Sequence, residues 1–79
     1  MNSEHLAKEA ARLKSDEIFQ KALTDIRAET LDALALADAD DKTMILRLQQ
    51  KAAVIDEIRT VLDRYIMAAD VQENAGSFA

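Results

Sequence analysis

The sequence predicts an all-α protein, and three observations support this fold class. The chain of 79 residues contains no proline, and its one glycine, Gly76, lies near the C-terminus, so nothing before that point interrupts a helix. Strong helix formers such as Ala, Leu, Glu and Lys are abundant. Apolar residues recur at steps of three and four, and no useful length shows the alternation of a strand. We therefore expect a single helical domain over residues 1–69.

The first expected helix is short and covers about residues 3–14. Its apolar side carries Leu6, Ala10 and Leu13. Ser3 is a candidate cap, because a serine hydroxyl can accept a hydrogen bond from an exposed amide of the first turn. The step from Leu13 to Ile18 is five residues and breaks the register. We expect a corner near residues 14–15, and a helix that continues through residue 15 is the alternative.

The second expected helix covers residues 16–37. Ser15 precedes the acidic pair Asp16 and Glu17. A serine cap and carboxylates in the first turn both stabilise a helix N-terminus. The face that we expect to be apolar contains Ile18, Phe19, Ala22, Leu23, Ile26, Thr30, Ala33, Leu34 and Ala37, widened by Leu31.

The third expected helix, residues 41–69, has the clearest periodicity. Its main apolar stripe contains Met44, Ile45, Leu48, Ala52, Ile55, Ile58, Leu62, Ile66 and Ala69. An adjacent stripe contains Val54, Ile58, Val61 and Tyr65. One neighbouring helix cannot cover so wide a face, so two or more neighbours are implied. From residue 42 to residue 69 this helix would be about 42 Å long, which is long for a lone chain of this size.

The segment "DADDKT", residues 38–43, separates the two long helices and has two interpretations. As a calcium loop it would need glycine at position 6 and an acidic residue at position 12, where this chain has Thr43 and Gln49. As a bend, Asp38 or Asp40 would cap a helix that begins near Asp41, where negative charge is stabilised. A connection of this length joins adjacent antiparallel helices. We therefore expect the bend of a helical hairpin.

Composition argues against most enzyme classes. There is no cysteine, so disulfides and thiolate sites are excluded. His5 is the one histidine and has no spaced partner for a zinc site. No nucleophile–base pair or phosphate loop is visible, so we expect no catalytic residues, no metal and no cofactor. The net charge of −5 disfavours nucleic acid and anionic membranes, and no apolar run is long enough to span a bilayer. We expect a soluble, cytoplasmic protein.

Several charged groups remain as weaker candidates. Asp25, Glu29 and Asp32 share a helical face that lies roughly opposite the apolar one, which favours a solvated surface. Arg47 and Lys51 form a small basic patch on the third helix, but the other charges there alternate in sign, unlike a helix that reads DNA. No nucleic-acid-binding residues are assigned.

The C-terminal segment, residues 70–79, loses the apolar periodicity. We expect it to be a flexible tail. Phe78 is a lone aromatic residue in this polar stretch, and such a residue can act as an anchor that becomes ordered on a partner.

Two long segments carry a resemblance to a known class of proteins. They are "LKSDEIFQKALTDIRAETLDA" and, after the acidic bend, "LRLQQKAAVIDEIRTVLDRYIMA". Together they resemble small helical proteins encoded in the structural modules of tailed phages and gene transfer agents, over most of residues 6–69. The matching positions are Asp16, Phe19, Ala22, Leu23, Arg47, Leu62 and Ile66. The resemblance implies virion assembly or head-related interaction, in the host cytoplasm or the virion, and no activity.

These observations predict a helical hairpin with a short leading helix that associates into an oligomeric bundle, most simply a homodimer. The function would be a non-catalytic structural or assembly interaction, with itself or with another virion or host protein. The interface residues would be Ile55, Ile58, Leu62, Tyr65 and Ile66. One alternative is a small DNA-packaging or regulatory factor resembling a terminase small subunit. Another is an adaptor or inhibitor that binds a host protein through one amphipathic helix.

Overall fold

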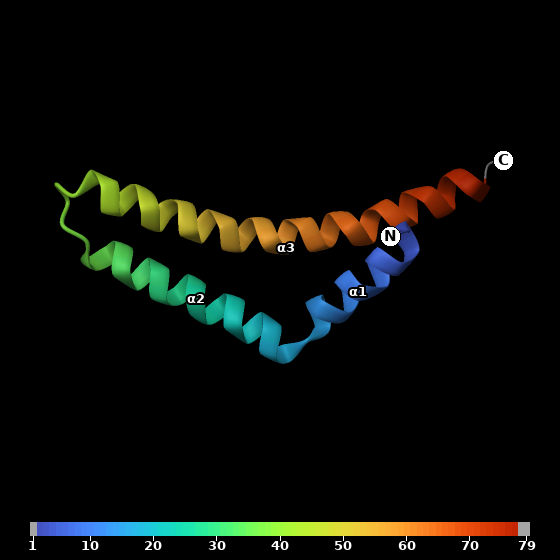
Figure 1. The fold of residues 1–79 in the computed structure, drawn as a ribbon, viewed down its shortest axis with the longest axis horizontal. Helices are drawn as coiled ribbons and strands as arrows, with labels where there is room; N and C mark the ends of the chain where they lie inside the picture. The colour runs from blue at the N-terminus through green and yellow to red at the C-terminus, as the bar shows by residue number, and fades with distance from the viewer. Residues whose placement is uncertain (1, 78–79) are drawn as a thin grey trace.

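The computed structural model describes the backbone of residues 2–77 and the side chains of residues 2–69. It contains three helices: α1 (Ser3–Ser15), α2 (Glu17–Leu36) and α3 (Lys42–Ser77). No strand occurs within residues 2–77, so the all-α prediction is confirmed. Helix α3 is a long curved rod, and α1 and α2 follow it end to end in the opposite direction, forming a V (Figure 1). The leading helix α1 thus folds back onto α3 of its own chain.

The corner between α1 and α2 is made by Asp16 alone. Its backbone N–H donates to the carbonyl of Leu13 at 3.1 Å, which closes the last turn of α1. Its carboxylate accepts from the N–H of Phe19 at 2.9 Å, which caps the first turn of α2. The predicted corner is therefore present, but α2 begins at Glu17, and Asp16 takes the capping role that we expected of Ser15. The carboxylate reaches the amide three residues ahead and also suits the positive helix end.

The other helix starts are capped by side chains as well. Asn2, and not Ser3, caps α1, since its Oδ1 accepts from the N–H of His5 at 2.7 Å. In the bend, Asp38 Oδ1 accepts from the N–H of Asp40 at 2.9 Å, and Asp41 Oδ1 accepts from the N–H of Met44 at 3.1 Å. The acidic cluster is thus the bend of a hairpin, in which an Asx turn leads into a helix cap.

Helix α3 continues to Ser77, whereas the sequence pattern predicted an end at residue 69. The loss of apolar periodicity led to the shorter boundary. Backbone hydrogen bonds propagate a helix without an apolar stripe, and residues 70–75 contain neither glycine nor proline. Phe78 and Ala79 lie outside the described residues, so the anchor suggested for Phe78 stays a prediction, as does the flexibility of the tail.

The helices pack through seams with alternating steps of three and four residues. The most buried apolar side chains are Ala10 on α1, Leu23 on α2, and Ile55 and Leu62 on α3. Thr30 is also buried, and its hydroxyl donates to the Ile26 carbonyl at 2.7 Å. The buried and half-buried positions of α3 along this seam are Ile45, Leu48, Ala52, Ile55, Arg59, Leu62, Ile66 and Ala69. This is the heptad spacing of a coiled coil.

Candidate interaction surface

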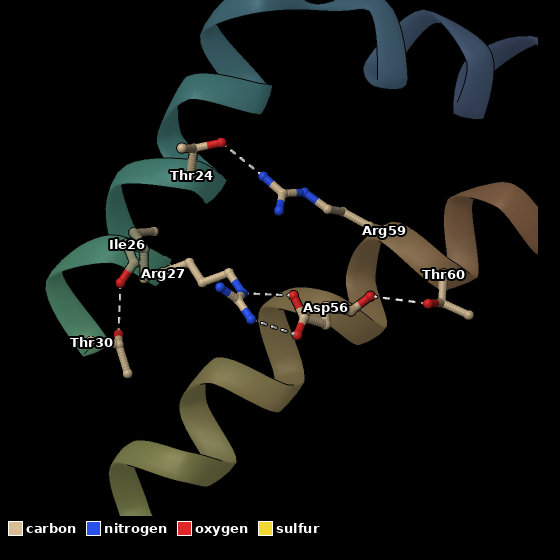
Figure 2. A network of polar contacts seen from close by, with 7 residues as sticks. All are labelled: Thr24, Ile26, Arg27, Thr30, Asp56, Arg59 and Thr60. Atoms are coloured by element: carbon tan, nitrogen blue, oxygen red, sulfur yellow. Dashed lines mark hydrogen bonds and ion pairs between the residues drawn. The ribbon is translucent and has the colours of Figure 1, made fainter. Parts of the chain in front are cut away.

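One side of the hairpin, here called the polar flank, is held by side-chain contacts between α3 and the two shorter helices. Arg27 donates to both carboxylate oxygens of Asp56, from Nε at 2.8 Å and from Nη2 at 3.3 Å. Arg59 Nη2 donates to the hydroxyl of Thr24 at 2.9 Å. Figure 2 shows these side chains extending across the space between α2 and α3. Nearer the corner, Lys14 of α1 pairs with Asp63 of α3.

These polar contacts orient the helices more than they stabilise them. The Arg27 side chain is 38% exposed and that of Asp56 is 53% exposed. Ion pairs this exposed contribute about 0–1 kcal/mol each, because water screens the charges and two long side chains lose freedom. The bidentate geometry of Arg27 on Asp56 nevertheless defines one relative position of α2 and α3. The polar flank therefore sets how the hairpin is aligned.

The other side of the hairpin carries an apolar hollow on α3. Its lining consists of Val54, Glu57, Ile58, Val61 and Leu62, around a cavity of about 270 Å³. Val54 is 51% exposed, and Ile58 and Val61 are half-buried. No side chain of α1 or α2 lines this hollow. The second apolar stripe of α3 therefore remains partly uncovered in the single chain.

Helical geometry places the apolar hollow and the polar flank on opposite sides. One residue step turns a helix position by about 100°. On α3, the buried residues Ile55 and Leu62 are each preceded by a valine, Val54 or Val61. Each is followed by an aspartate, Asp56 or Asp63. The first pair therefore lies on one side of the buried seam and the second pair on the other.

Helix α2 extends the apolar side. The positions of α2 that precede seam positions are Phe19, Ala22, Ile26, Glu29, Ala33 and Leu36. Helices α2 and α3 are antiparallel. In such a pair, the residues that directly precede the seam positions lie on the same side of the hairpin in both helices. Leu36 is 87% exposed and Ile26 is more than one-third exposed. The uncovered stripes of α2 and α3 together form what we call the apolar side.

The structure divides the predicted interface residues into two groups. Ile55 and Leu62 are 6% and 8% exposed and belong to the seam within the chain. Ile58, Tyr65 and Ile66 are half-buried, and Ile58 and Tyr65 lie on the second stripe of α3. The residues open to a partner are therefore those of the second stripe. Ile18, which we expected on the apolar face of the second helix, is 77% exposed instead.

Sequence reasoning missed two features of this surface. It listed an apolar face on the second helix but named interface residues only on the third helix, and it did not identify Arg27 and Arg59 as half-buried residues in the seam. The first signal was present, because the second stripe precedes the seam by one residue in both helices. The second feature had no signal in the sequence, since an arginine at a seam position cannot be distinguished from a surface charge until its partner across the seam is known.

The other candidate residues lie on exposed surface. Asp25, Glu29 and Asp32 are exposed, and so are Arg47 and Lys51. Lys21 donates to Asp25 at 2.6 Å, and this hydrogen bond, with the charge of Asp25, raises the pKa of the Lys21 ammonium above its usual 10.5. His5 lines a shallow polar hollow at the start of α1 with Asn2, Glu4 and Lys8. Within the described residues, no three His, Asp or Glu side chains come together as metal ligands would.

The surface area indicates how much of the chain is left uncovered. Its accessible surface is 6070 Å². A monomeric protein of this mass exposes about 4,800 Å². The excess of about 1,300 Å² exceeds the roughly 800 Å² that each partner loses in an interface of standard size.

No described helix joins enough length to enough hydrophobicity to cross a membrane.

Comparison of the chain with protein-family models, curated proteins and solved structures gives no match.

Proposed function

We propose that this protein is a non-catalytic interaction module that associates with itself through the apolar side of its hairpin. The observation that carries the proposal is the hollow around Val54, Ile58 and Val61, which opens opposite the polar flank. A two-helix layer with one polar and one apolar side leaves the apolar side in water unless a second layer covers it. Two such layers make a four-helix bundle, the simplest closed arrangement.

Burial and charge favour this proposal over a site for a small molecule or nucleic acid. The titratable side chains around the hollow are solvated, and Glu57 is the one that lines it. A surface that binds nucleic acid would carry a basic footprint, whereas the net charge here is −5. An apolar stripe with charged residues at its edges is the usual form of a helix–helix interface.

The resemblance to proteins of tailed phages and gene transfer agents gives the proposal a setting. There the module would serve virion assembly, as a self-associating part or as a contact to another virion protein. This setting predicts that the protein accompanies purified particles or their precursors, detected by mass spectrometry. Its absence from both would restrict the proposal to self-association.

The test of self-association is the solution mass, measured by light scattering over a concentration series, with helicity followed by circular dichroism. We expect a helical species of twice the 8.8 kDa chain mass, which dissociates on dilution. A chain that stays monomeric and helical up to millimolar concentration would overturn the proposal.

A further inference from the structure

Resting on the proposed function, we propose that the occupant of the apolar side is a second copy of the chain, and that the two α3 helices pair antiparallel about a two-fold axis between Ile58 and Val61. In this register Ile58 lies opposite Val61 of the second copy, and Val54 lies opposite Tyr65 of the second copy. The two-fold symmetry gives each of these facing pairs twice, so the interface contains four consecutive pairs of apolar residues.

The spacing of the stripe supports a helix as its occupant. Lys51, Val54, Ile58, Val61, Tyr65 and Ala68 follow one another at alternating steps of three and four. This heptad stripe lies one residue before the heptad seam that packs on α1 and α2. Two seams about 100° apart on one helix match the two neighbours that each helix has in a square four-helix bundle. The first neighbour is the α1–α2 arm of the same chain, and the second is α3 of the other copy.

The charges at the ends of the stripe exclude a parallel pairing. Arg47 and Lys51 occupy stripe positions and are exposed. In a parallel dimer Arg47 would face Arg47 of the second copy and Lys51 would face Lys51, so like charges would meet within the interface. The antiparallel register places Lys51 beside Ala68 of the second copy, which is small and exposed in the single chain. A lysine stem can lie over it while the ammonium reaches water.

The edge charges select one antiparallel register from its neighbours. Glu57 and Arg64, both exposed, lie seven residues apart at the edge of the stripe away from α2. In the proposed register Glu57 faces Arg64 of the second copy, and symmetry gives this pair twice. Shifting the register by one heptad in one direction brings Glu57 near Glu57 of the second copy. Shifting it in the other direction brings Arg64 near Arg64 of the second copy. Only the proposed register makes both edge contacts attractive.

The area fits a second copy. The chain exposes 6070 Å², about 1,300 Å² more than a monomeric protein of its mass. This excess is larger than the roughly 800 Å² that each partner loses in an interface of standard size.

The experiment exchanges the edge charges and measures dimerisation by sedimentation equilibrium. We expect Glu57→Lys and Arg64→Glu each to weaken dimerisation about tenfold or more, because each turns two attractive contacts into two repulsive ones. An equal mixture of the two variants restores wild-type dimerisation, because each chain then supplies the charge that the other lacks. Asp32→Lys and Lys8→Glu make the same charge changes on exposed positions outside the stripe and leave dimerisation unchanged.

A cysteine experiment tests the same register without charge changes, since the chain has no native cysteine. We expect a chain with Ile58→Cys to form a disulfide faster with a chain carrying Val61→Cys than either forms with itself. A wild-type dimer whose charge variants are not rescued by mixing, and whose fastest disulfide joins position 58 to itself, overturns the register but leaves self-association standing. A monomeric wild-type chain overturns both.

Discussion

At the scale of single residues, aspartates cap the two long helices, α2 and α3. The carboxylates of Asp16 and Asp41 each accept a hydrogen bond from the backbone amide three residues ahead, and that of Asp38 accepts from the amide two residues ahead. A carboxylate at this position satisfies an amide that the helix leaves without a partner and meets the positive end of the helix dipole. The carboxylates of Asp38 and Asp41 in the bend therefore bind backbone amides.

Asp16 offers the clearest test of this capping role. We expect Asp16→Ala to lower the free energy of unfolding by about 1 kcal/mol, because the amide of Phe19 loses its acceptor at the corner. Urea denaturation at fixed protein concentration measures the change. Asp32→Ala, at an exposed position within α2, is the control and should cost nothing, since alanine is the better helix former. Equal stability of the two variants would contradict the role of Asp16.

Lys21 gives a prediction about pH. Its hydrogen bond with Asp25 raises the pKa of the ammonium, so the folded chain holds this proton more tightly than the unfolded chain. The contribution to stability is therefore fully present below the unfolded pKa of 10.5 and is lost as pH rises through the higher folded pKa. We expect Asp25→Asn to lower the pKa of Lys21, as followed by NMR of the side-chain nitrogen. An unchanged pKa would show that the pair does not persist in solution.

At the scale of the elements, α3 is a helix with two seams and a polar flank. One seam packs on α1 and α2 through Ile55 and Leu62. The second, through Val54, Ile58 and Val61, is only partly covered in the single chain. Asp56 and Asp63 lie on the remaining side, where they bind Arg27 and Lys14. Each side of this one helix thus has a different role.

Single substitutions on the apolar side and on the polar flank of α3 test whether only the apolar side takes part in dimerisation. We expect Val54→Asp to weaken dimerisation roughly 100-fold, because two carboxylates enter the interface and two apolar contacts are lost. Leu46→Asp is the matched control, since Leu46 is about as exposed as Val54 but lies on the polar flank. Sedimentation equilibrium gives the dissociation constants, and circular dichroism checks that both variants remain helical. If Leu46→Asp weakened dimerisation as much, the interface would not be on the apolar side.

At the scale of the whole molecule, the chain is too elongated to have a large core. Its radius of gyration is 17.3 Å, and its extents are 59 × 24 × 17 Å. A compact domain of this length has a radius of gyration of about 12 Å. The mostly buried apolar side chains are Ala10, Leu23, Ile55 and Leu62 among residues 2–69. Since a chain this small buries little surface by itself, we expect the proposed dimerisation to be coupled to folding.

Coupling of this kind makes the melting temperature depend on concentration. We expect the midpoint to rise by roughly 5–10 °C for a hundredfold increase in protein concentration, given the enthalpy of a dimer of this size. Circular dichroism melts at the two concentrations measure the shift. Val54→Asp should lower the midpoint at both concentrations, since it weakens dimerisation. A midpoint that does not move in the wild-type chain would mean that the hairpin is stable alone.

Much of the fold follows from local sequence signals. The absence of proline, the three- and four-residue steps, and the break after Leu13 predicted three helices and the corner. The errors were at boundaries, where capping depends on one side chain. Asp16 and Asn2 took the roles expected of Ser15 and Ser3, and α3 extended past residue 69. The interface itself stays a prediction. Two of the residues expected in it, Ile55 and Leu62, are buried within the single chain, which no periodicity of one helix could indicate.

The sequence by itself determined that α3 carries two apolar stripes, because periodicity is a property of one helix. Only the tertiary structure decided which stripe is used within the chain. That choice depends on how α2 is aligned along α3, and the alignment involves contacts between residues far apart in the sequence, such as Arg27 with Asp56 and Arg59 with Thr24. With α2 and α3 antiparallel, the remaining apolar stripes of both helices lie on the same side of the hairpin, which is the surface that we propose for a partner.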